Sequence, residues 1–325
     1  MTDPVLSVQD LTMHYQTRQG AVSAVDNVSF DLLQGQSLGL VGESGCGKTS
    51  IAMTMLRLLP ENGRIINGAV YLDGSDILTL DERGVRKVRW RGISMVFQAA
   101  MNALDPVYRV GDQIVEALQT HFHDLSENEG RDLVAKLFPR VGLDPCLMDC
   151  YPHEFSGGMR QRAVIAMALS CEPKIIIADE PTTALDVIVQ DRILKQLRAI
   201  QQEQEMGMIY ISHDIAVIAE VSDRMGIMYA GRLVELADVL EIFEEPQHPY
   251  TVALMSAFPS IEGQRQDLRA LPGEPPDLLN PPDGCRFHPR CSRVTAECRE
   301  SQPKFEEIHA GHYVACWHPM EANHG

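Results

Sequence analysis

The spacing of apolar and polar positions predicts an α/β fold. Residues 5–8 and 22–32 alternate apolar and polar side chains as antiparallel strands do, and residues 37–41 form an apolar run typical of a buried strand. A glycine-rich turn separates this run from residues 48–59, whose helix-favouring composition ends at Pro60. The turn therefore lies between a strand and a helix.

The middle of the chain changes to helical patterns. Apolar residues recur with helical spacing in three stretches: residues 110–121, 129–141 and 159–169. We interpret residues 105–171 as a helical subdomain inserted into the α/β core. Strand-like apolar runs surround it, at residues 93–97, 174–178 and 208–211, with a helical stretch at 187–204. This alternation of strands and helices is typical of a parallel sheet.

After residue 245 the sequence becomes irregular and rich in proline, as in LPGEPPDLLNPPDG at residues 271–284. A chain of 325 residues is long for a single core. We therefore predict one large domain over residues 1–245 and a small extension over residues 246–325.

Composition and charge exclude several classes of function. The chain is 45% hydrophobic and 22% charged, as globular proteins are. Its net charge of -17 repels nucleic-acid phosphates, so no nucleic-acid partner is expected. No apolar run approaches the roughly 18–20 residues that span a bilayer, and the start lacks a signal-peptide pattern. We expect a protein that is neither secreted nor membrane-spanning, whose eight cysteines are reduced thiols or metal ligands.

The turn after residues 37–41 carries a phosphate-binding motif. Residues 42–49 read GESGCGKT and match the P-loop pattern G-x-x-x-x-G-K-[ST] in its strand–turn–helix context. Backbone N–H groups and the helix N-terminus favour phosphate oxygens, while Lys48 reaches the β- and γ-phosphates and Thr49 offers its hydroxyl to Mg²⁺. The alternative, an ordinary glycine-rich turn with an exposed lysine, is disfavoured by this context.

An acid pair ends another predicted strand. Asp179 and Glu180 follow an apolar run, where a P-loop ATPase has an acid that holds Mg²⁺ and a second acid that polarises the attacking water. Taken alone, the pair would equally suit capping of the helix after Pro181. Together with the P-loop it favours ATP hydrolysis.

Residues 155–162 read FSGGMRQR at the start of a predicted helix. This segment resembles the L-S-G-G-Q signature of the ATP-binding cassette (ABC) family, which contacts the γ-phosphate of ATP held by a second subunit. Phe155 and Met159 depart from the signature, but they flank the Ser156-Gly157-Gly158 that would touch phosphate. The structural alternative is a helix N-cap.

Four further positions match the family one at a time. Gln98 resembles the Q-loop glutamine, His213 the switch histidine, the segment 184–186 the D-loop, and Tyr15 the aromatic residue that stacks on adenine. Alone, each has an ordinary explanation as a strand end, a helix start or a core aromatic residue.

The resemblance covers residues 5–245 and implies an ABC ATPase core, with a mixed sheet and an antiparallel β subdomain. It implies nucleotide contacts from Tyr15, Gly42, Ser44, Gly45, Cys46, Gly47, Lys48, Thr49, Ser50, Gln98, Ser156, Gly157, Gly158, Asp179 and Asp186. It implies Mg²⁺ ligation by Thr49, Gln98 and Asp179. It implies catalytic roles for Glu180, His213, Lys48 and Gln98. One catalytic set per chain implies that two ATPases, identical or related, meet head to tail to complete two ATP sites.

The extension indicates which branch of the ABC family the chain resembles. Residues 246–251 read PQHPYT and resemble the P-x-H-P-Y-T segment of ATPases that energise oligopeptide and dipeptide importers. The structural explanation is a helix that begins at a proline and packs Tyr250, Leu254 and Phe258 on the core. The two interpretations are compatible.

Four cysteines of the extension, Cys285, Cys291, Cys298 and Cys316, are spaced C-x5-C-x6-C-x17-C. Four thiolates suit a soft metal, but structural zinc sites usually begin with a closely spaced pair, whereas iron–sulfur clusters tolerate varied spacing. Spacing alone leaves an iron–sulfur cluster, zinc and free thiols open. The resemblance to the peptide-importer subfamily implies a [4Fe-4S] cluster, which could simply cross-link a small extension.

The resemblance implies a peripheral ATPase on the cytoplasmic side of the inner membrane that drives import of di- or oligopeptides. Its partners would be two transmembrane permease subunits, docked at the groove between core and helical subdomain, and, indirectly, an extracytoplasmic solute-binding protein. The alternatives are an importer for nickel or another non-peptide solute, and a soluble ABC ATPase outside transport. A non-catalytic regulator is disfavoured because Lys48, Asp179, Glu180 and His213 are all present.

Overall fold

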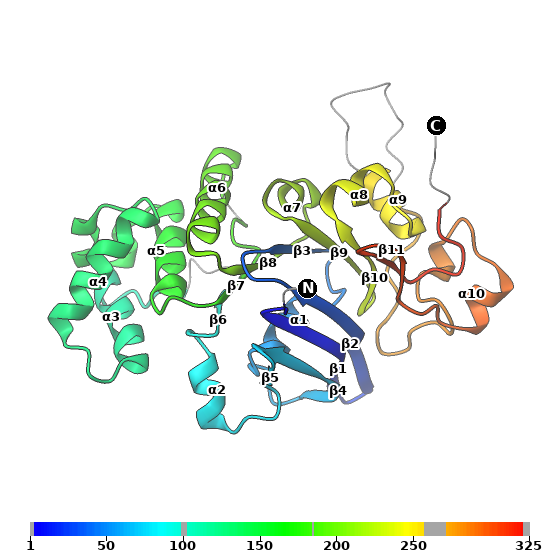
Figure 1. The fold of residues 1–325 in the computed structure, drawn as a ribbon, viewed down its shortest axis with the longest axis horizontal. Coiled ribbons are helices and arrows are strands. Elements are labelled where there is room, and N and C mark those ends of the chain that lie inside the picture. Colours follow the sequence, from blue (N-terminus) through cyan, green and yellow to red (C-terminus); the bar gives the residue numbers. More distant parts are fainter. Residues whose placement is uncertain (1–2, 99–102, 184, 257–270, 321–325) are drawn as a thin grey trace. The chain divides into compact units, whose positions relative to one another are not determined.

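The computed structural model describes residues 3–98, 103–183, 185–256 and 271–320 (Figure 1). Tertiary contacts divide the chain into two compact units. The segments of the first unit are Met1–Ser7, Asp31–Ser37 and Val70–Ile211, and those of the second are Val8–Phe30, Leu38–Ala69 and Ser212–Gly325. Both units are therefore built from segments that lie far apart in the sequence.

Three parallel strands form the centre of the first unit: β6 (Ile93–Val96), β7 (Ile175–Asp179) and β8 (Gly207–Ser212). In register, Ile93 pairs with Ile175 and Ile175 with Gly207. Every residue of these strands is buried, which explains why the sequence shows continuous apolar runs there. The strands lie within one residue of the predicted ones.

Helices make up most of the rest of the first unit. The longest is α6 (Val187–Gln204), between β7 and β8, and α3 (Val110–His121), α4 (Glu127–Arg140) and α5 (Gly157–Leu169) pack on one another (Figure 1). The smaller elements are β5 (Ser75–Asp76), α2 (Glu82–Val88) and 3₁₀ turns at Pro145–Asp149 and Pro152–Glu154.

Helix α4 begins two residues before the predicted start at Glu129. The Ser126 hydroxyl accepts the Glu129 N–H at 3.3 Å, and the Glu129 carboxylate accepts the Ser126 N–H at 2.9 Å. This reciprocal capping box satisfies two backbone donors and sets the start of the helix.

The second unit contains an antiparallel sheet with the strand order β2 (Gly20–Leu32), β1 (Leu6–Thr17) and β4 (Gly63–Leu72). Strand β1 runs well beyond the predicted strand at residues 5–8. Asp10 adopts a left-handed backbone (φ 48°), with its N–H bonded to the Ser29 hydroxyl at 2.8 Å. This irregularity interrupts the alternation of apolar and polar residues. The second half of the strand therefore could not be predicted from the sequence.

The other sheet of this unit has the order β3 (Ser37–Val41), β9 (Arg224–Tyr229), β10 (Arg232–Asp238), β12 (His312–Val314) and β11 (Glu306–His309). Only the β3–β9 pair is parallel. The extension therefore adds its last two strands to a sheet begun by the P-loop strand.

The helices of the second unit are α1 (Lys48–Met55), α7 (Ile215–Val221), α8 (Val239–Glu244), α9 (Pro249–Ser256), α10 (Ala296–Glu300) and the 3₁₀ turn His288–Arg290. The prediction that the first helix extends to residue 59 is wrong. Arg57 adopts a left-handed backbone (φ 51°), and the Leu58 N–H turns back to the Met53 carbonyl at 2.9 Å. The helix thus ends before Pro60 restricts the chain.

Within the described residues, no helix is both long enough and apolar enough to span a bilayer.

Candidate functional site

The P-loop joins β3 to α1 in the second unit. Gly47 has a φ of 109°, and a Cβ there would lie 2.1 Å from the carbonyl oxygen of Ala24. A Cβ on Gly42 would lie equally close, 2.1 Å, to the carbonyl oxygen of Met228. Only glycine fits at either position, so the neighbouring strands β2 and β9 fix both ends of the loop.

Lys48, the first residue of α1, is 7% exposed and folds back over the loop. Its Nζ donates to the carbonyl oxygens of Gly42 at 2.7 Å and Glu43 at 3.1 Å, and lies 3.6 Å from the Cys46 sulfur. Burial raises the pKa of the Cys46 thiol, so the thiol stays neutral beside the lysine. The ammonium group is therefore held at the loop that the sequence assigns to phosphate.

Four other predicted site residues lie in this unit. The half-buried Tyr15 brings its hydroxyl to 3.2 Å from the Ser50 hydroxyl in the first turn of α1. Tyr15 therefore sits beside the P-loop helix rather than inside the core. Thr49 is exposed, and so is His213, which directly follows β8.

The acid pair lies in the first unit, where β7 ends. Asp179 is 1% exposed, and Glu180 adopts a left-handed backbone (φ 46°) with its N–H bonded to the Ile211 carbonyl at 2.8 Å. The Glu180 carboxylate accepts hydrogen bonds from the Gln98 amide at 2.8 Å and the Thr183 hydroxyl at 3.0 Å. Two residues selected independently from the sequence, Gln98 and Glu180, are thus in direct contact. Strained backbone of this kind concentrates at functional sites.

The signature segment opens α5, also in the first unit. The exposed Ser156 caps the helix, accepting the Met159 N–H at 3.3 Å, and Gly157 and Gly158 form the first turn. A Cβ on Gly158 would lie 2.8 Å from the side chain of Val189. The two glycines carry no side chain that would shield the N–H groups of the first turn from an anion.

Of the predicted D-loop, Ala184 lies outside the described residues, whereas Asp186 caps α6 by accepting the Val189 N–H at 2.9 Å. The next residues, Val187 and Ile188, are 81% and 66% exposed. Two neighbouring apolar side chains therefore face water at the start of α6.

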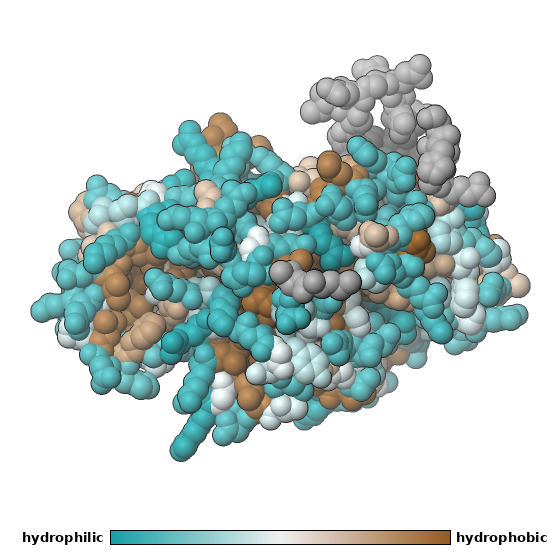
Figure 2. Space-filling view, viewed as in Figure 1, coloured by the Kyte–Doolittle hydropathy of each residue, from teal (hydrophilic) through white to brown (hydrophobic). Residues whose placement is uncertain are grey.

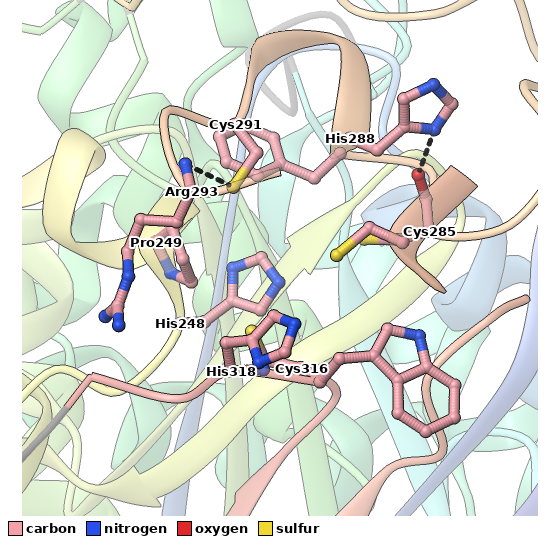
Figure 3. A pocket seen from close by; sticks show the side chains of 11 residues that line it. His248, Pro249, Cys285, His288, Cys291, Arg293, Cys316 and His318 are labelled. Carbon is pink, nitrogen blue, oxygen red and sulfur yellow. Dashed lines mark hydrogen bonds between the residues drawn. The ribbon is translucent and has the colours of Figure 1, made fainter. Parts of the chain in front are cut away.

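The four cysteines of the extension line one cavity in the second unit (Figure 3). The residues around them include His248, His288, His318 and Phe287. Backbone N–H groups of Arg293 and His318 donate to the sulfurs of Cys291 and Cys316, both at 3.4 Å, and the Thr295 hydroxyl lies 3.3 Å from the Cys298 sulfur. Hydrogen bonds of this kind stabilise thiolates that bind metals.

Burial raises the pKa of Cys285 and of Cys316 to about 11, so the metal-free thiols are protonated at neutral pH. Any metal must therefore displace these protons as it binds. Among the described residues, no three His, Cys, Asp or Glu side chains are close enough together to hold one metal ion.

Sequence patterns missed how the extension reaches the P-loop. Arg290 pairs with Glu43 of the loop, and the Tyr250 hydroxyl accepts the Glu43 N–H at 3.2 Å. Tyr250 is buried as predicted, but Leu254 is only partly buried, and Phe258 lies outside the described residues. The sequence gives one indication of the ion pair between Glu43 and Arg290. An acidic residue within a loop that binds anions needs a positive partner.

Comparisons with known proteins agree with this geometry. The profile of the ABC transporter family matches residues 25–183, and that of the oligopeptide/dipeptide transporter C-terminal region matches residues 234–298. The bacterial ABC transporter cassette MJ0796, solved as a dimer, superimposes with a TM-score of 0.65 at 26% identity, covering 72% of this chain and 98% of that one. The cbiO1 cassette of Clostridium perfringens superimposes with a TM-score of 0.65 at 27% identity. The match covers 77% of this chain and 93% of the cbiO1 chain.

Several relatives match nearly the whole chain. The oligopeptide transport ATP-binding protein OppD of Escherichia coli K12 is 42% identical, over 98% of this chain and 94% of its own length. The dipeptide transport ATP-binding protein DppD of Bacillus subtilis is 43% identical, over 97% and 95%. Fold and motifs thus define an ATP-hydrolysing ABC cassette, as predicted. More narrowly, the chain belongs to the oligopeptide/dipeptide importer branch of the ABC transporter ATP-binding family.

Proposed function

We propose that this chain hydrolyses ATP to drive import of di- and oligopeptides through a membrane transporter. The observation that carries the proposal is the similarity to peptide-transport ATPases over cassette and extension alike. We assign the ABC domain to residues 1–245, its helical subdomain to about residues 105–171, and the importer-type extension to residues 246–325.

The P-loop, residues 42–50, binds the ATP phosphates, with Lys48 at the β- and γ-phosphates and Tyr15 against the adenine. Support comes from the glycine-only backbone and from the position of Tyr15 beside Ser50. Thr49, Gln98 and Asp179 are the side chains that hold Mg²⁺. Their hydroxyl, amide and carboxylate oxygens are the ligands that this cation prefers.

Glu180 is the general base for the attacking water. Its carboxylate is oriented by the Gln98 amide and the Thr183 hydroxyl, and it is partly exposed, so water can reach it. His213 orients the water and contacts the γ-phosphate, and Lys48 stabilises the developing charge. The proton leaves the water for the Glu180 carboxylate as the water oxygen bonds to the γ-phosphorus, while the bond from that phosphorus to the β–γ bridging oxygen breaks and ADP leaves.

A second ATPase, identical or related, completes each site. The exposed start of α5, with Ser156, Gly157 and Gly158, offers N–H groups to the γ-phosphate bound by that second subunit. Asp186 and the exposed apolar pair at the start of α6 supply further contact surface. ATP binding closes this dimer and hydrolysis reopens it.

Two transmembrane permease subunits provide the path through the inner membrane, with the ATPase on its cytoplasmic side and a solute-binding protein acting outside. A hollow of about 650 Å³ on the helical part of the first unit suits such docking. Apolar Leu118, Phe122 and Leu133 line it together with the charged residues Asp124 and Glu129. Figure 2 shows brown apolar surface over α3 and α4.

The cysteine cavity holds a [4Fe-4S] cluster through Cys285, Cys291, Cys298 and Cys316. This proposal is supported by four cysteines that line one cavity, with backbone N–H groups at the sulfurs of Cys291 and Cys316 and the Thr295 hydroxyl at that of Cys298. We expect anaerobically purified protein to be brown and to contain about four iron atoms per chain. Colourless protein with one zinc ion per chain and no iron would contradict this assignment.

The assignment of Glu180 is tested by Glu180→Gln. The variant should bind ATP normally, lose turnover, and run as an ATP-trapped dimer in size-exclusion chromatography. Glu203→Gln, on a side chain that is 70% exposed, is the matched control and should hydrolyse ATP normally. Undiminished hydrolysis by Glu180→Gln would exclude this residue as the base.

Cargo is tested in the source cell with chromosomal Lys48→Ala. We expect uptake of labelled di- and tripeptides to fall to background, with nickel uptake unchanged. Normal peptide uptake with loss of nickel uptake would favour the alternative importer. Normal uptake of both solutes would favour a cassette outside transport.

A further inference from the structure

In the sequence Arg290 lies between Cys285 and Cys291, two of the four cysteines that line the cavity. Its side chain points to the P-loop instead. Its guanidinium forms a two-point ion pair with Glu43, with Nη1 2.6 Å from Oε2 and Nη2 3.0 Å from Oε1. The Arg290 side chain is 5% exposed. This fork-to-fork geometry is the strongest form of a protein ion pair.

The remaining contacts fix the orientation of Arg290. Its Nε donates to the Pro272 carbonyl at 2.9 Å, and Nη1 also lies 3.4 Å from the Tyr229 hydroxyl. The guanidinium packs over the Tyr229 ring at 5.7 Å from its centroid. Arg290 donates both hydrogen bonds of the ion pair to the Glu43 carboxylate, and an arginine guanidinium keeps its positive charge at neutral pH.

All polar groups of Glu43 are engaged. Its N–H donates to the Tyr250 hydroxyl at 3.2 Å, and its carbonyl accepts from Lys48 Nζ at 3.1 Å and from the Cys46 N–H at 3.2 Å. The extension therefore holds Glu43 at its backbone and at its carboxylate. The same residue orients Lys48, so movement of Glu43 would move the phosphate-binding lysine.

The negative charge of Glu43 is a second reason why this residue needs Arg290 as its partner. A free carboxylate in this loop would repel the ATP phosphates, and the repulsion is strong where burial limits screening. Because Arg290 is almost fully buried, its charge cancels that of Glu43 with little competition from water. Truncating one partner of such a pair leaves the other charge uncompensated.

We propose that Arg290 is a positioning residue of the nucleotide site, which neutralises Glu43 and holds the P-loop in its phosphate-binding conformation. This inference rests on the proposed ATP site at residues 42–50. It makes the cysteine-bearing extension a part of the machinery that binds ATP. Arg290 does not touch the reacting atoms. Its loss should therefore change the affinity for ATP and leave the rate of the chemical step nearly unchanged.

The test measures binding of a fluorescent ATP analogue to the full chain. Arg290→Met should weaken binding roughly tenfold and raise KM for ATP with kcat nearly unchanged. Arg299→Met, an exposed arginine of the same extension, is the matched control and should bind normally. Glu43→Gln in the Arg290→Met background should recover most of the affinity, because it removes the uncompensated charge.

A merely structural role would give no such rescue, and a double variant as weak as Arg290→Met would overturn the proposal. Affinity of Arg290→Met within twofold of the parent would also overturn it. Lys48→Ala must lose binding in the same assay; if it binds normally, the proposed ATP site itself is wrong. If Arg290→Met does not fold, Arg290→Lys keeps the charge without the two-point geometry and should weaken binding by a smaller factor.

Discussion

Replacement of Glu235 should detach the extension from its sheet. Glu235 lies in β10 with an exposure of 0%, and its carboxylate accepts three hydrogen bonds. The donors are the N–H of Gln247 at 2.6 Å, the N–H of His248 at 2.9 Å and Nε2 of His312 at 2.8 Å. One side chain thus joins β10 to the start of the extension and to β12.

The magnitude follows from these bonds. Glu235→Ala leaves three buried donors unsatisfied, each costing about 1–3 kcal/mol, so about 3–9 kcal/mol of unfolding free energy should be lost. Glu235→Gln keeps one acceptor oxygen and can retain two of the bonds, so about 1–3 kcal/mol is expected. Glu241→Ala is the control, because Glu241 lies 3.7 Å from Nδ1 of His312 but is 48% exposed, and exposed pairs contribute about 1 kcal/mol or less.

Trp317 provides the assay. It lies in the extension with its Nε1 bonded to the Ser301 carbonyl at 3.0 Å, and Trp90 is the only other tryptophan in the sequence. In a Trp90→Phe background, Trp317 fluorescence during urea unfolding reports the extension. A loss for Glu235→Ala no larger than that for Glu241→Ala would refute the reasoning.

Two further predictions concern single sites. Gly39→Ala places a Cβ 2.0 Å from the Ile218 side chain and 2.8 Å from the Ser222 hydroxyl. Thermal denaturation should therefore show a loss of about 1–3 kcal/mol in the free energy of unfolding. Unchanged stability would mean that α7 can shift. Ser126→Ala removes the cap of α4 and should cost about 1 kcal/mol, with faster hydrogen exchange confined to the first turn of that helix; exchange unchanged there would contradict the capping role.

The sequence predicted those features whose cause is local. The P-loop could be placed because its strand, turn and helix are contiguous. Helices α3 and α6 lie at the predicted residues because their apolar spacing is local, and Asp186 caps the start of α6. The acid pair could be placed because it directly follows a buried strand.

Features that depend on distant partners could not be predicted. Glu43 and Arg290 are 247 residues apart, and Glu235 is a charged residue within an apolar strand, explained only by the donors that surround it. Strands β11 and β12 are too short to show a period, and β11 is largely exposed. Their place is set by the pairing of β12 with β10 and of β11 with β12, and these pairings leave no local pattern in the sequence.

The pair of Glu43 and Arg290 has an evolutionary consequence. A mutation at either position leaves an uncompensated charge, so the two positions should change together across related cassettes. A lineage that shortens or loses its extension should also replace the acid at position 43 with a neutral residue. Coupled substitution at these positions would then trace the gain and loss of the extension through the family.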